Sequence, residues 1–331
     1  MSRGFKPDAF EIQEYIDHLQ KQPWMYKSRA WWPRFVFHFT NMDNAIRILE
    51  SGKLLSRNRI EQTGGMPTDN ASAEVIDQTD DRWKDYVRLY FRPRTPTQHN
   101  NEGFRPEAYR ERNSHCPVPV YFLFDAKKLL SREGVFFSKI SLAVRHARIF
   151  SDAAGFRSIP FERVYHDTRF EPHERSEIIQ HRHAEVVVQD ELDLEDLKHV
   201  WCRSEAEYQT FLNRLSPETR ERWKERIGGG KKGNLFFREW IFVDKVDLSK
   251  DSITFTLNVP PLQELHIPMK LLIEDLNTGK KNKWEKPQCK VQDRLRFHIS
   301  VQQPSYYSVK LYFENQLMYY GRFSEELEVP Y

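Results

Sequence analysis

Three short segments of the chain alternate between apolar and polar residues with a period of two. Successive side chains of a β-strand point to opposite faces of a sheet, so this pattern predicts strands with one apolar face and one functional face. The functional faces carry His38, Tyr90 and Glu185 in turn. A solvated polar face is the ordinary interpretation of any single strand of this kind, but three together indicate a polar cleft between sheets. The segments are residues 35–40, 87–92 and 182–189.

The pattern around these strands predicts further strands and helices. Residues 41–55 have the spacing of a compact helix, with Asn41 as its N-cap and Gly52 as its C-terminal stop. Residues 117–125 form an apolar run that predicts another strand. Strands and helices mixed in this way predict an α+β fold.

The pattern changes after the first two thirds of the chain. Residues 227–234, IGGGKKGN, are rich in glycine and lysine, and this composition predicts a flexible basic hinge. The short alternating runs that follow predict an all-β, immunoglobulin-like sandwich. We therefore expect an N-terminal helix with a basic-aromatic segment (1–34), a main domain (35–227) and a C-terminal sandwich (228–331).

Composition and charge narrow the possible functions only broadly. The chain has 331 residues, is 39% hydrophobic and carries a net charge of +3. A protein that coats duplex DNA is usually more basic, so this charge permits local basic patches without requiring them. The three cysteines are scattered, which argues against a disulfide framework. Because the sequence has no long apolar run, we expect a cytoplasmic protein with no membrane partner.

Several familiar cofactor motifs are missing from the sequence. The glycine-rich stretch lacks the GK[ST] ending of a P-loop, and no GxGxxG follows a predicted strand. Histidines and acidic residues gather in and before the third alternating segment, so a metal-dependent nuclease or hydrolase is one alternative function. A non-catalytic scaffold whose sandwich does the binding is another. The residues of that histidine and acidic cluster are His166, Asp167, His173, Glu177, His181, His183 and Glu185.

Three blocks of sequence resemble one known family in their order and spacing. They are HFTNMDNAIRILESGKLLSR from residue 38, DYVRLYFRPRTP from residue 85 and HAEVVVQDELDLEDLKHV from residue 183. Over roughly residues 35–215 the chain is similar to the DarT family, toxins that transfer ADP-ribose from NAD to bases of single-stranded nucleic acid. The resemblance implies an ADP-ribosyltransferase-like split β-sheet core with helices, NAD as a substrate, and no metal.

The resemblance also implies roles for individual residues. Glu185 corresponds to the catalytic glutamate of the family. His38 and Thr40 match a strand that contacts NAD, and Asn44 matches the start of the helix after it. Three more matches to the NAD site come from the YFxPRSP block of the family, and they are Tyr90, Phe91 and Arg94.

The family implies partners as well, and one of its features is missing here. The implied partners are single-stranded DNA or RNA as the acceptor, an antitoxin and a chaperone, in a toxin–antitoxin or phage-defence system. An arginine-rich helix usually precedes the second block, but the corresponding segment here, AEVIDQTDDRWK, is acidic as far as Arg82. We therefore expect either that Arg57, Arg59 or Arg82 replaces the functional arginine of that helix, or that the acceptor of the reaction differs.

The chemistry of ADP-ribose transfer fits these residues independently of the resemblance. Cleavage of the nicotinamide–ribose bond builds positive charge on the ribose, which a carboxylate such as Glu185 stabilises. A base nitrogen is a weak nucleophile, and the same carboxylate can accept its proton. His38 is suited to orient the nicotinamide end, and Tyr90 offers it a ring face. Arg92 and Arg94 are close in sequence to this site and offer cations to the diphosphate.

A basic and aromatic stretch precedes the first predicted strand. Residues 24–35, WMYKSRAWWPRF, combine tryptophans with lysine and arginine, which bind single strands through stacking and phosphate contacts. We expect Trp31 and Trp32 from this stretch, with Arg92 and Arg148 from later segments, to contact nucleic acid. Packing of the tryptophans into the core is an alternative of equal weight.

Overall fold

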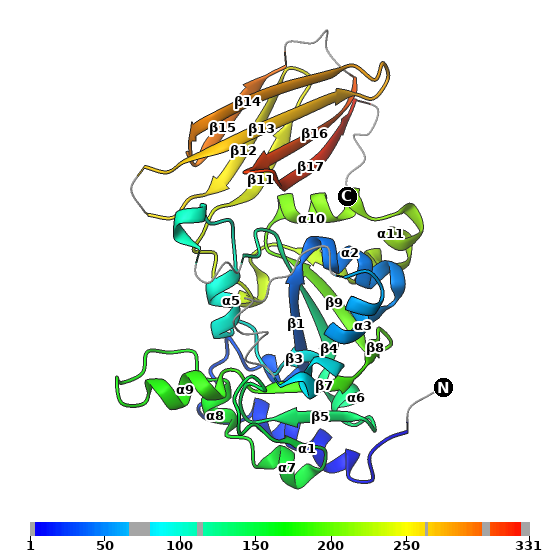
Figure 1. The fold of residues 1–331 in the computed structure, drawn as a ribbon, viewed down its shortest axis with the longest axis vertical. Coiled ribbons are helices and arrows are strands. Elements are labelled where there is room, and N and C mark those ends of the chain that lie inside the picture. The colour runs from blue at the N-terminus through cyan, green and yellow to red at the C-terminus, as the bar shows by residue number, and fades with distance from the viewer. Residues whose placement is uncertain (1–3, 66–79, 111–114, 262–263, 300–304, 326–331) are drawn as a thin grey trace.

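A computed structural model shows the fold, and it describes residues 4–65, 80–110, 115–261, 264–299 and 305–325. The first part of the chain mixes strands and helices, and the last part contains strands only (Figure 1). The strand-only part lies at one end of the long axis, next to helix α10 (Glu205–Arg214) (Figure 1). The predicted α+β class, with a β-sandwich after it, is confirmed.

A mixed sheet of eight strands forms the centre of the first part. The strands are β1 (Phe35–Asn41), β3 (Tyr86–Tyr90), β4 (Pro119–Asp125), β5 (Val135–Ser138), β6 (Ile149–Phe150), β7 (Glu185–Gln189), β9 (Leu197–Cys202) and β10 (Ile227–Gly229). Their order across the sheet is β10-β9-β4-β1-β3-β7-β5-β6. A separate pair consists of β2 (Lys53–Leu55) and β8 (Glu191–Asp193).

The sheet is split between β1 and β3. These two strands share a single residue pair, Phe37 opposite Tyr90. By contrast, β1 pairs with β4 along its whole length, from Phe35 opposite Asp125 to Asn41 opposite Pro119. The sheet therefore consists of two well-paired halves with a short seam between them, as the family resemblance implies.

Helix α2 (Met42–Ser51) follows β1 directly and begins and ends where the sequence predicts. The Asn41 side chain accepts a hydrogen bond from the backbone N–H of Asp43 at 3.0 Å, which caps the helix. Gly52 ends it with a φ of 72°, a left-handed conformation that favours glycine. The other helices are α1 (Ala9–Gln20), α3 (Arg57–Gln62), α5 (Pro96–Asn101), α6 (Ala126–Leu130), α7 (Ala153–Arg157), α8 (Phe161–Val164), α9 (Arg175–His181) and α11 (Pro217–Trp223).

Two sheets form the C-terminal sandwich. One has the order β11-β12-β15 and the other β14-β13-β16-β17. Alternate residues of each sheet, such as Phe255 and Leu311, are fully buried between them. The strands are β11 (Phe242–Leu248), β12 (Ser252–Asn258), β13 (His266–Asp275), β14 (Lys281–Lys290), β15 (Arg294–His298), β16 (Tyr306–Phe313) and β17 (Gln316–Ser324).

The expected flexible hinge at residues 227–234 is wrong, because its first three residues form strand β10 at the edge of the main sheet. The glycines there allow close packing. A Cβ on Gly228 would lie 2.4 Å from the Trp201 ring, and one on Gly229 would lie 2.7 Å from Tyr208. Residues 235 and 236 are then buried against the sheet. We therefore propose that the main domain extends to about residue 240 rather than to 227.

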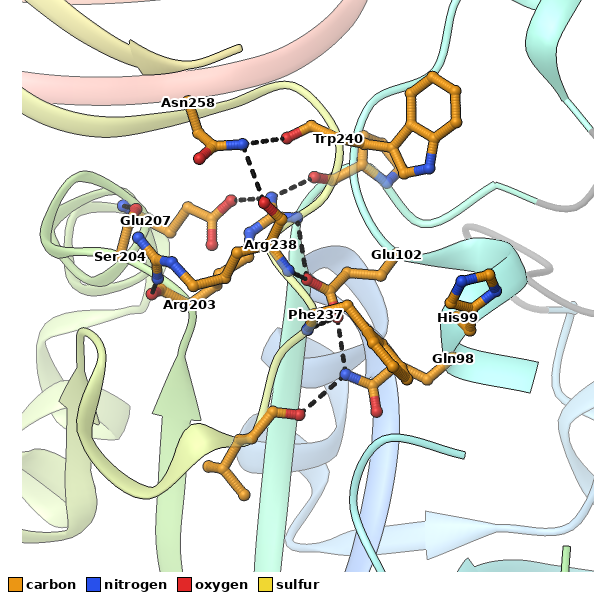
Figure 2. Close-up of polar contacts among 12 residues, drawn as sticks. Gln98, His99, Glu102, Arg203, Ser204, Glu207, Phe237, Arg238, Trp240 and Asn258 are labelled. Atoms are coloured by element: carbon orange, nitrogen blue, oxygen red, sulfur yellow. Dashed lines mark hydrogen bonds and ion pairs between the residues drawn. The ribbon is translucent and has the colours of Figure 1, made fainter. Parts of the chain in front are cut away.

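A buried carboxylate fixes the segment that follows β10. Glu102 accepts hydrogen bonds from the backbone N–H groups of Phe237, at 2.9 Å, and Arg238, at 2.8 Å. It also accepts one from the Gln98 amide at 2.7 Å. Figure 2 shows this arrangement, with Asn258 of the sandwich donating to Trp240 O at 2.8 Å on its far side. The connection to the sandwich is thus held by specific hydrogen bonds on both sides.

The sandwich rests on helix α10 through the free edge of β17. The backbone N–H of Tyr320 donates to Thr210 Oγ1 at 3.0 Å, and Asn213 donates to Tyr320 O at 3.3 Å. Ser204, the N-cap of the helix, donates to Val243 O of β11 at 2.6 Å. Side chains of the helix thereby satisfy backbone groups that an exposed edge strand would leave unpaired.

Within the described parts of the chain, no helix is both long enough and apolar enough to cross a membrane.

The packing of residues 235 and 236 can be tested by Phe236→Ala. Phe236 is 4% exposed, and its ring contacts Tyr121 edge-on with centroids 5.3 Å apart. Removing a buried phenylalanine side chain should lower the free energy of unfolding by about 3–5 kcal/mol, measured by urea denaturation. Lys232→Ala, an exposed control in the same segment, should change it by less than about 0.5 kcal/mol. Equal values for the two variants would show that the segment is a loose linker.

Candidate active site

The two faces of the split sheet pack against different clusters. Leu89 of β3 belongs to the large core on one face. On the opposite face, Phe37 belongs to one small cluster and Val187 to another. Tyr90 lies directly opposite both Phe37 and Glu185, so Tyr90 and Glu185 share the face that bears the small clusters. The candidate active site is the polar region between those two clusters.

Glu185 is the buried carboxylate of this region, with a side chain only 1% exposed. Ser141 Oγ donates to its Oε1 at 3.3 Å, and Arg88 Nε lies 3.7 Å from its Oε2. Among the described residues, Oε2 accepts no hydrogen bond. Burial raises the pKa of Glu185, and the nearby charge of Arg88 opposes that rise. A buried oxygen without a donor is suited to receive a hydroxyl or N–H of a ligand.

Tyr90 and Arg88 complete the face around Glu185. Burial raises the pKa of Tyr90 to about 12, so its phenol is neutral at physiological pH. The Arg88 side chain is 25% exposed, and one of its terminal nitrogens is buried without an acceptor among the described residues. The site therefore offers an aromatic ring, a guanidinium and a carboxylate side by side.

Phe91 does not reach this region, so its predicted contact with NAD is wrong. It points to the opposite face from Tyr90, as the alternation of β3 requires, and is 2% exposed. Its ring packs edge-on against Phe161 in the large core, with centroids 5.3 Å apart. Phe91 is a packing residue.

His38 lies on the opposite face of the sheet from Glu185, which the predicted common polar face did not anticipate. The register places His38 beside Phe122 of β4, and their rings meet edge-on at 6.2 Å. His38 Nδ1 is 3.0 Å from Arg88 O, at the seam between β1 and β3. A carbonyl oxygen only accepts, so Nδ1 must donate, which leaves Nε2 unprotonated in the neutral ring. Burial lowers the pKa of His38 to about 4, so the ring is neutral at pH 7.

Thr40 and Asn44 lie close to His38, at the junction of β1 and α2. Both are buried, and the Asn44 amide donates to Thr40 Oγ1 at 3.3 Å. The predicted trio of His38, Thr40 and Asn44 is thus brought together by one strand–helix unit. It stands on the β1 half of the split sheet, whereas Glu185 stands on the other half.

Arg92 and Arg94 are held by a single acidic residue. Asp167 accepts from Arg92 at 2.6 Å and from Arg94 at 2.9 Å. Arg92 is completely buried and also donates to Val164 O at 3.0 Å. Burial lowers its pKa to about 9. The predicted contact of Arg92 with nucleic acid is therefore wrong, because its guanidinium is enclosed by protein.

Two more arginines gather around Asp167. Its charge acts on both Arg29 and Arg182, whose pKa values burial lowers. Within the described residues, the Nε atoms of Arg29, Arg94 and Arg182 are buried without acceptors. Arg94 also stacks on Phe237, with its guanidinium 4.8 Å from the ring centroid. One carboxylate thus faces several guanidinium groups, and the excess positive charge suits an anionic ligand.

The remaining predicted nucleic-acid contacts differ in exposure. Trp32 is 1% exposed and belongs to the core, so its predicted stacking on a base is wrong and the packing alternative holds for it. Trp31 is partly exposed, and its ring meets Phe35 and Phe37 edge-on. Arg148 is exposed. Only Trp31 and Arg148 are therefore placed where a strand could reach them.

Two histidines of the metal alternative, His181 and His183, form hydrogen bonds to backbone carbonyl groups. His181 Nδ1 donates to Lys139 O at 3.0 Å, and His183 Nδ1 donates to Ile179 O at 3.0 Å. Among the described residues, no group of three or more His, Cys, Asp or Glu side chains is placed to hold a metal ion. The structure thus does not assemble the histidine and acidic cluster into a ligand set.

Among the described residues, none of the arginines expected to replace the family's helix arginine forms an ion pair with Glu185. Arg82 is 60% exposed beside Asp80, with its Nε 3.1 Å from the carboxylate. Arg57 lies 3.9 Å from Glu61, and Arg59 is exposed. The first part of the acidic segment, residues 73–79, lies outside the described residues. Arg88 is the arginine that stands beside the Glu185 carboxylate.

Sequence reasoning missed three residues of this site. Arg88 could have been found, because it lies two positions before Tyr90 on the same face of an alternating strand. No local pattern marks Ser141, which lies in a loop, and the sequence indicates Asp167 only as a member of the histidine and acidic cluster. Only the fold brings them to Glu185 and to the arginines.

Several solved structures are similar to part of this chain. The structure of Thermus sp. 2.9 DarT with ADP-ribosylated ssDNA is 18% identical, covers 62% of this chain and 97% of that chain, and has a TM-score of 0.48. The structure of the same protein with NAD+ is 18% identical, covers 62% of this chain and 98% of that chain, and has a TM-score of 0.46. The structure of Thermosipho africanus DarTG with ADP-ribose is 14% identical, covers 65% of this chain and 53% of that chain, and has a TM-score of 0.47.

No curated protein matches the chain. A family model described as "ssDNA thymidine ADP-ribosyltransferase, DarT" matches residues 37–230. Because this match spans more than half of the chain, the protein belongs to the DarT family of ssDNA thymidine ADP-ribosyltransferases.

Proposed function

We propose that this chain transfers ADP-ribose from NAD to a base of single-stranded DNA, with Glu185 as the catalytic carboxylate. The observation that carries the proposal is the buried Glu185 carboxylate, which has one oxygen without a hydrogen-bond donor among the described residues and lies opposite Tyr90. Membership of the family supports the same donor and acceptor chemistry.

The reaction breaks the bond between ribose C1′ and the nicotinamide nitrogen and forms a bond from C1′ to a base nitrogen. Nicotinamide leaves with the bonding electron pair, so positive charge develops on the ribose. The negative charge of Glu185 stabilises that charge at close range in a site with little water. The base nitrogen loses its proton, which Glu185 accepts before releasing it to solvent. Because burial raises the pKa of Glu185, this carboxylate is a better proton acceptor than an exposed one.

NAD is proposed to lie where the single pair Phe37–Tyr90 ends, because only beyond this short ladder can one ligand contact His38 and Glu185, which point to opposite faces of the sheet. The neutral ring of His38 donates through Nδ1, so its Nε2 is suited to accept a hydrogen bond from a ribose hydroxyl. Thr40 and Asn44 supply further polar groups on the same half. Tyr90 offers its ring to the nicotinamide on the other half, next to Glu185.

The arginines around Asp167 are proposed to hold phosphate. Arg94 is the member of this group that belongs to the predicted NAD site, and its side chain is 24% exposed. Its backbone has a φ of 57°, and its N–H donates to Gln98 Oε1 at 2.7 Å, so its position is fixed. We assign Arg94 to the NAD diphosphate, and Trp31 and Arg148 to the acceptor strand.

Labelled NAD tests the function directly. Incubation of the full chain with NAD labelled in the adenosine part should transfer the label to a single-stranded DNA oligonucleotide that contains thymidine. Matched arms contain RNA of the same sequence, and DNA in which every thymidine is replaced by another base. Label on RNA alone would replace the DNA acceptor by an RNA acceptor, and label on neither would refute the proposed transfer.

Glu185→Gln tests the catalytic assignment. It keeps the shape of the side chain but removes its charge, so kcat should fall by about two to three decades. Glu191→Gln, in the neighbouring strand β8, is the matched control and should keep kcat within about threefold. A Glu185→Gln enzyme within about threefold of the wild-type kcat would remove Glu185 from the mechanism.

The pH dependence of kcat tests the environment of Glu185. The carboxylate must be ionised to act, and its pKa is raised by burial. The acid limb of the kcat profile should therefore lie above the ordinary glutamate pKa of about 4.3. Arg88 lowers the pKa of Glu185, so Arg88→Met should move the limb to still higher pH, alongside any loss of rate. A limb that moves to lower pH in this variant would contradict the assignment.

An antitoxin and a chaperone remain proposed partners, and growth tests whether the chain is toxic alone. Induced expression of the wild type should arrest the host, because modified bases block the use of the single strand as a template. Expression of Glu185→Ala to the same level should not. Equal growth of the two strains without any partner gene would contradict a free-standing toxin.

A further inference from the structure

In β16 of the four-stranded sandwich sheet, residues of the buried face alternate with residues of the outer face. The residues at 307, 309, 311 and 313 point inward and are fully buried. On the outer face, Tyr306, Lys310 and Tyr312 are partly exposed, and the small residue Ser308 is buried. The pleat of β17 adds Tyr320 and Arg322 to this outer face.

Cations and tyrosine rings alternate across this face. Lys270 of β13 lies directly opposite Tyr312, with its Nζ 4.6 Å from the ring centroid. Lys310 lies directly opposite Tyr320 at 4.9 Å, and Arg322 approaches the same ring at 5.6 Å. We call these five residues the tyrosine–cation face.

Two of the three cations of this face have no acidic partner. Within the described residues, Lys310 and Arg322 have no carboxylate oxygen at ion-pair distance, whereas Lys270 lies directly opposite Glu285 of β14. In β14 itself, Lys281 pairs with Glu274 and Lys283 pairs with Glu285. The positive charge without an acidic partner is therefore that of Lys310 and Arg322, which both contact the Tyr320 ring.

The outer face of the other sandwich sheet shows that this composition is specific. In that sheet, Lys245 and Arg294 flank Thr256 on the outside, and Arg296 lies opposite Thr254. Lys245 pairs with Asp247 at 2.7 Å. This face carries cations but no tyrosine at those positions, so an exposed strand of the sandwich does not acquire aromatic rings by default.

We propose that the tyrosine–cation face binds single-stranded DNA, as a second contact for the acceptor strand outside the catalytic domain. This inference rests on the proposed function. Bases of a single strand can stack on tyrosine rings, and its phosphates complement unpaired lysine and arginine. A duplex hides its base faces, so a flat face of rings favours the single strand.

The position of the face supports this occupant. Asn213 of α10 donates a hydrogen bond to Tyr320 O at 3.3 Å. The next residue of the helix, Arg214, pairs with Asp43 in the first turn of α2. The face therefore begins beside the strand–helix unit that carries part of the proposed NAD site, and a strand that leaves the catalytic domain on that side can continue along it.

Binding as a function of salt separates this face from diffuse attraction. The protein is the full chain with Glu185→Gln, and the probe is a fluorescent single-stranded DNA of about thirty nucleotides. Each lost phosphate contact lowers the slope of log K against log salt by about 0.7. Changing Lys270, Lys310 and Arg322 together to Gln should therefore lower the slope by about 2. The matched control, Arg294→Gln with Arg296→Gln on the other sheet, should leave the slope unchanged, and an equal decrease in the control would overturn the proposal.

Ring variants test stacking separately from charge. Tyr312→Ala with Tyr320→Ala should weaken binding at least about tenfold with an unchanged salt slope. Tyr312→Phe with Tyr320→Phe keeps both rings and should bind like the parent protein. Unchanged binding in the double Ala variant would overturn the proposal, and would favour a protein partner for this face instead.

Turnover distinguishes failure of this inference from failure of the proposed function. In a chain with Glu185 intact, the double Ala variant should raise KM about tenfold for an acceptor of about thirty nucleotides, with kcat unchanged. For an acceptor of about six nucleotides, which cannot span both sites, KM should equal that of wild type. Equal KM values for the long acceptor would overturn the second contact alone. Absence of transfer by wild type to either acceptor would refute the proposed function, while the binding assay would still decide the face.

Discussion

The single residue pair between β1 and β3 is the constraint on which the active domain depends. Phe37 and Tyr90 form the only backbone register that joins these strands, and the His38 side chain then bonds to Arg88 O beside them. Because this ladder is so short, Glu185 stands on one half-sheet and the β1–α2 unit stands on the other. The position proposed for NAD, where the ladder ends, would let it contact both.

Because β1 and β3 share only one residue pair, other contacts must hold the two half-sheets in place, and charged side chains make some of these contacts. Asp167 holds Arg92 at the end of β3, and Glu102 holds the chain after β10 against the β1 half. Buried ions are costly unless they are fully bonded, so each of these carboxylates accepts from more than one donor. Glu185 is also buried, and there burial raises the pKa of the carboxyl group.

The sequence predicts within-strand geometry better than it predicts contacts between strands. Alternation correctly places Glu185 and Val187 on the face opposite Val186 and Val188. The same alternation puts Phe91 on the face opposite Tyr90, against the role that the family match implies for Phe91. It cannot assign His38 to a sheet face, because that depends on the register of β1 against β3. Tryptophan and arginine often contact nucleic acids, but the three-dimensional packing encloses Trp32 and Arg92 in the protein.

The boundary between the two regions shows why composition misleads there. Glycines at 228 and 229 suggest a hinge, yet they are needed because the Trp201 ring and Tyr208 leave no room for a Cβ. The segment after them is then fixed by Glu102, and the sandwich by α10. Domains joined through a flexible linker would present a strand-binding face at no fixed orientation. Because this sandwich is tied at both its connection and its edge, the tyrosine–cation face keeps one direction relative to Glu185, and that fixed geometry is what allows a second contact to guide the acceptor.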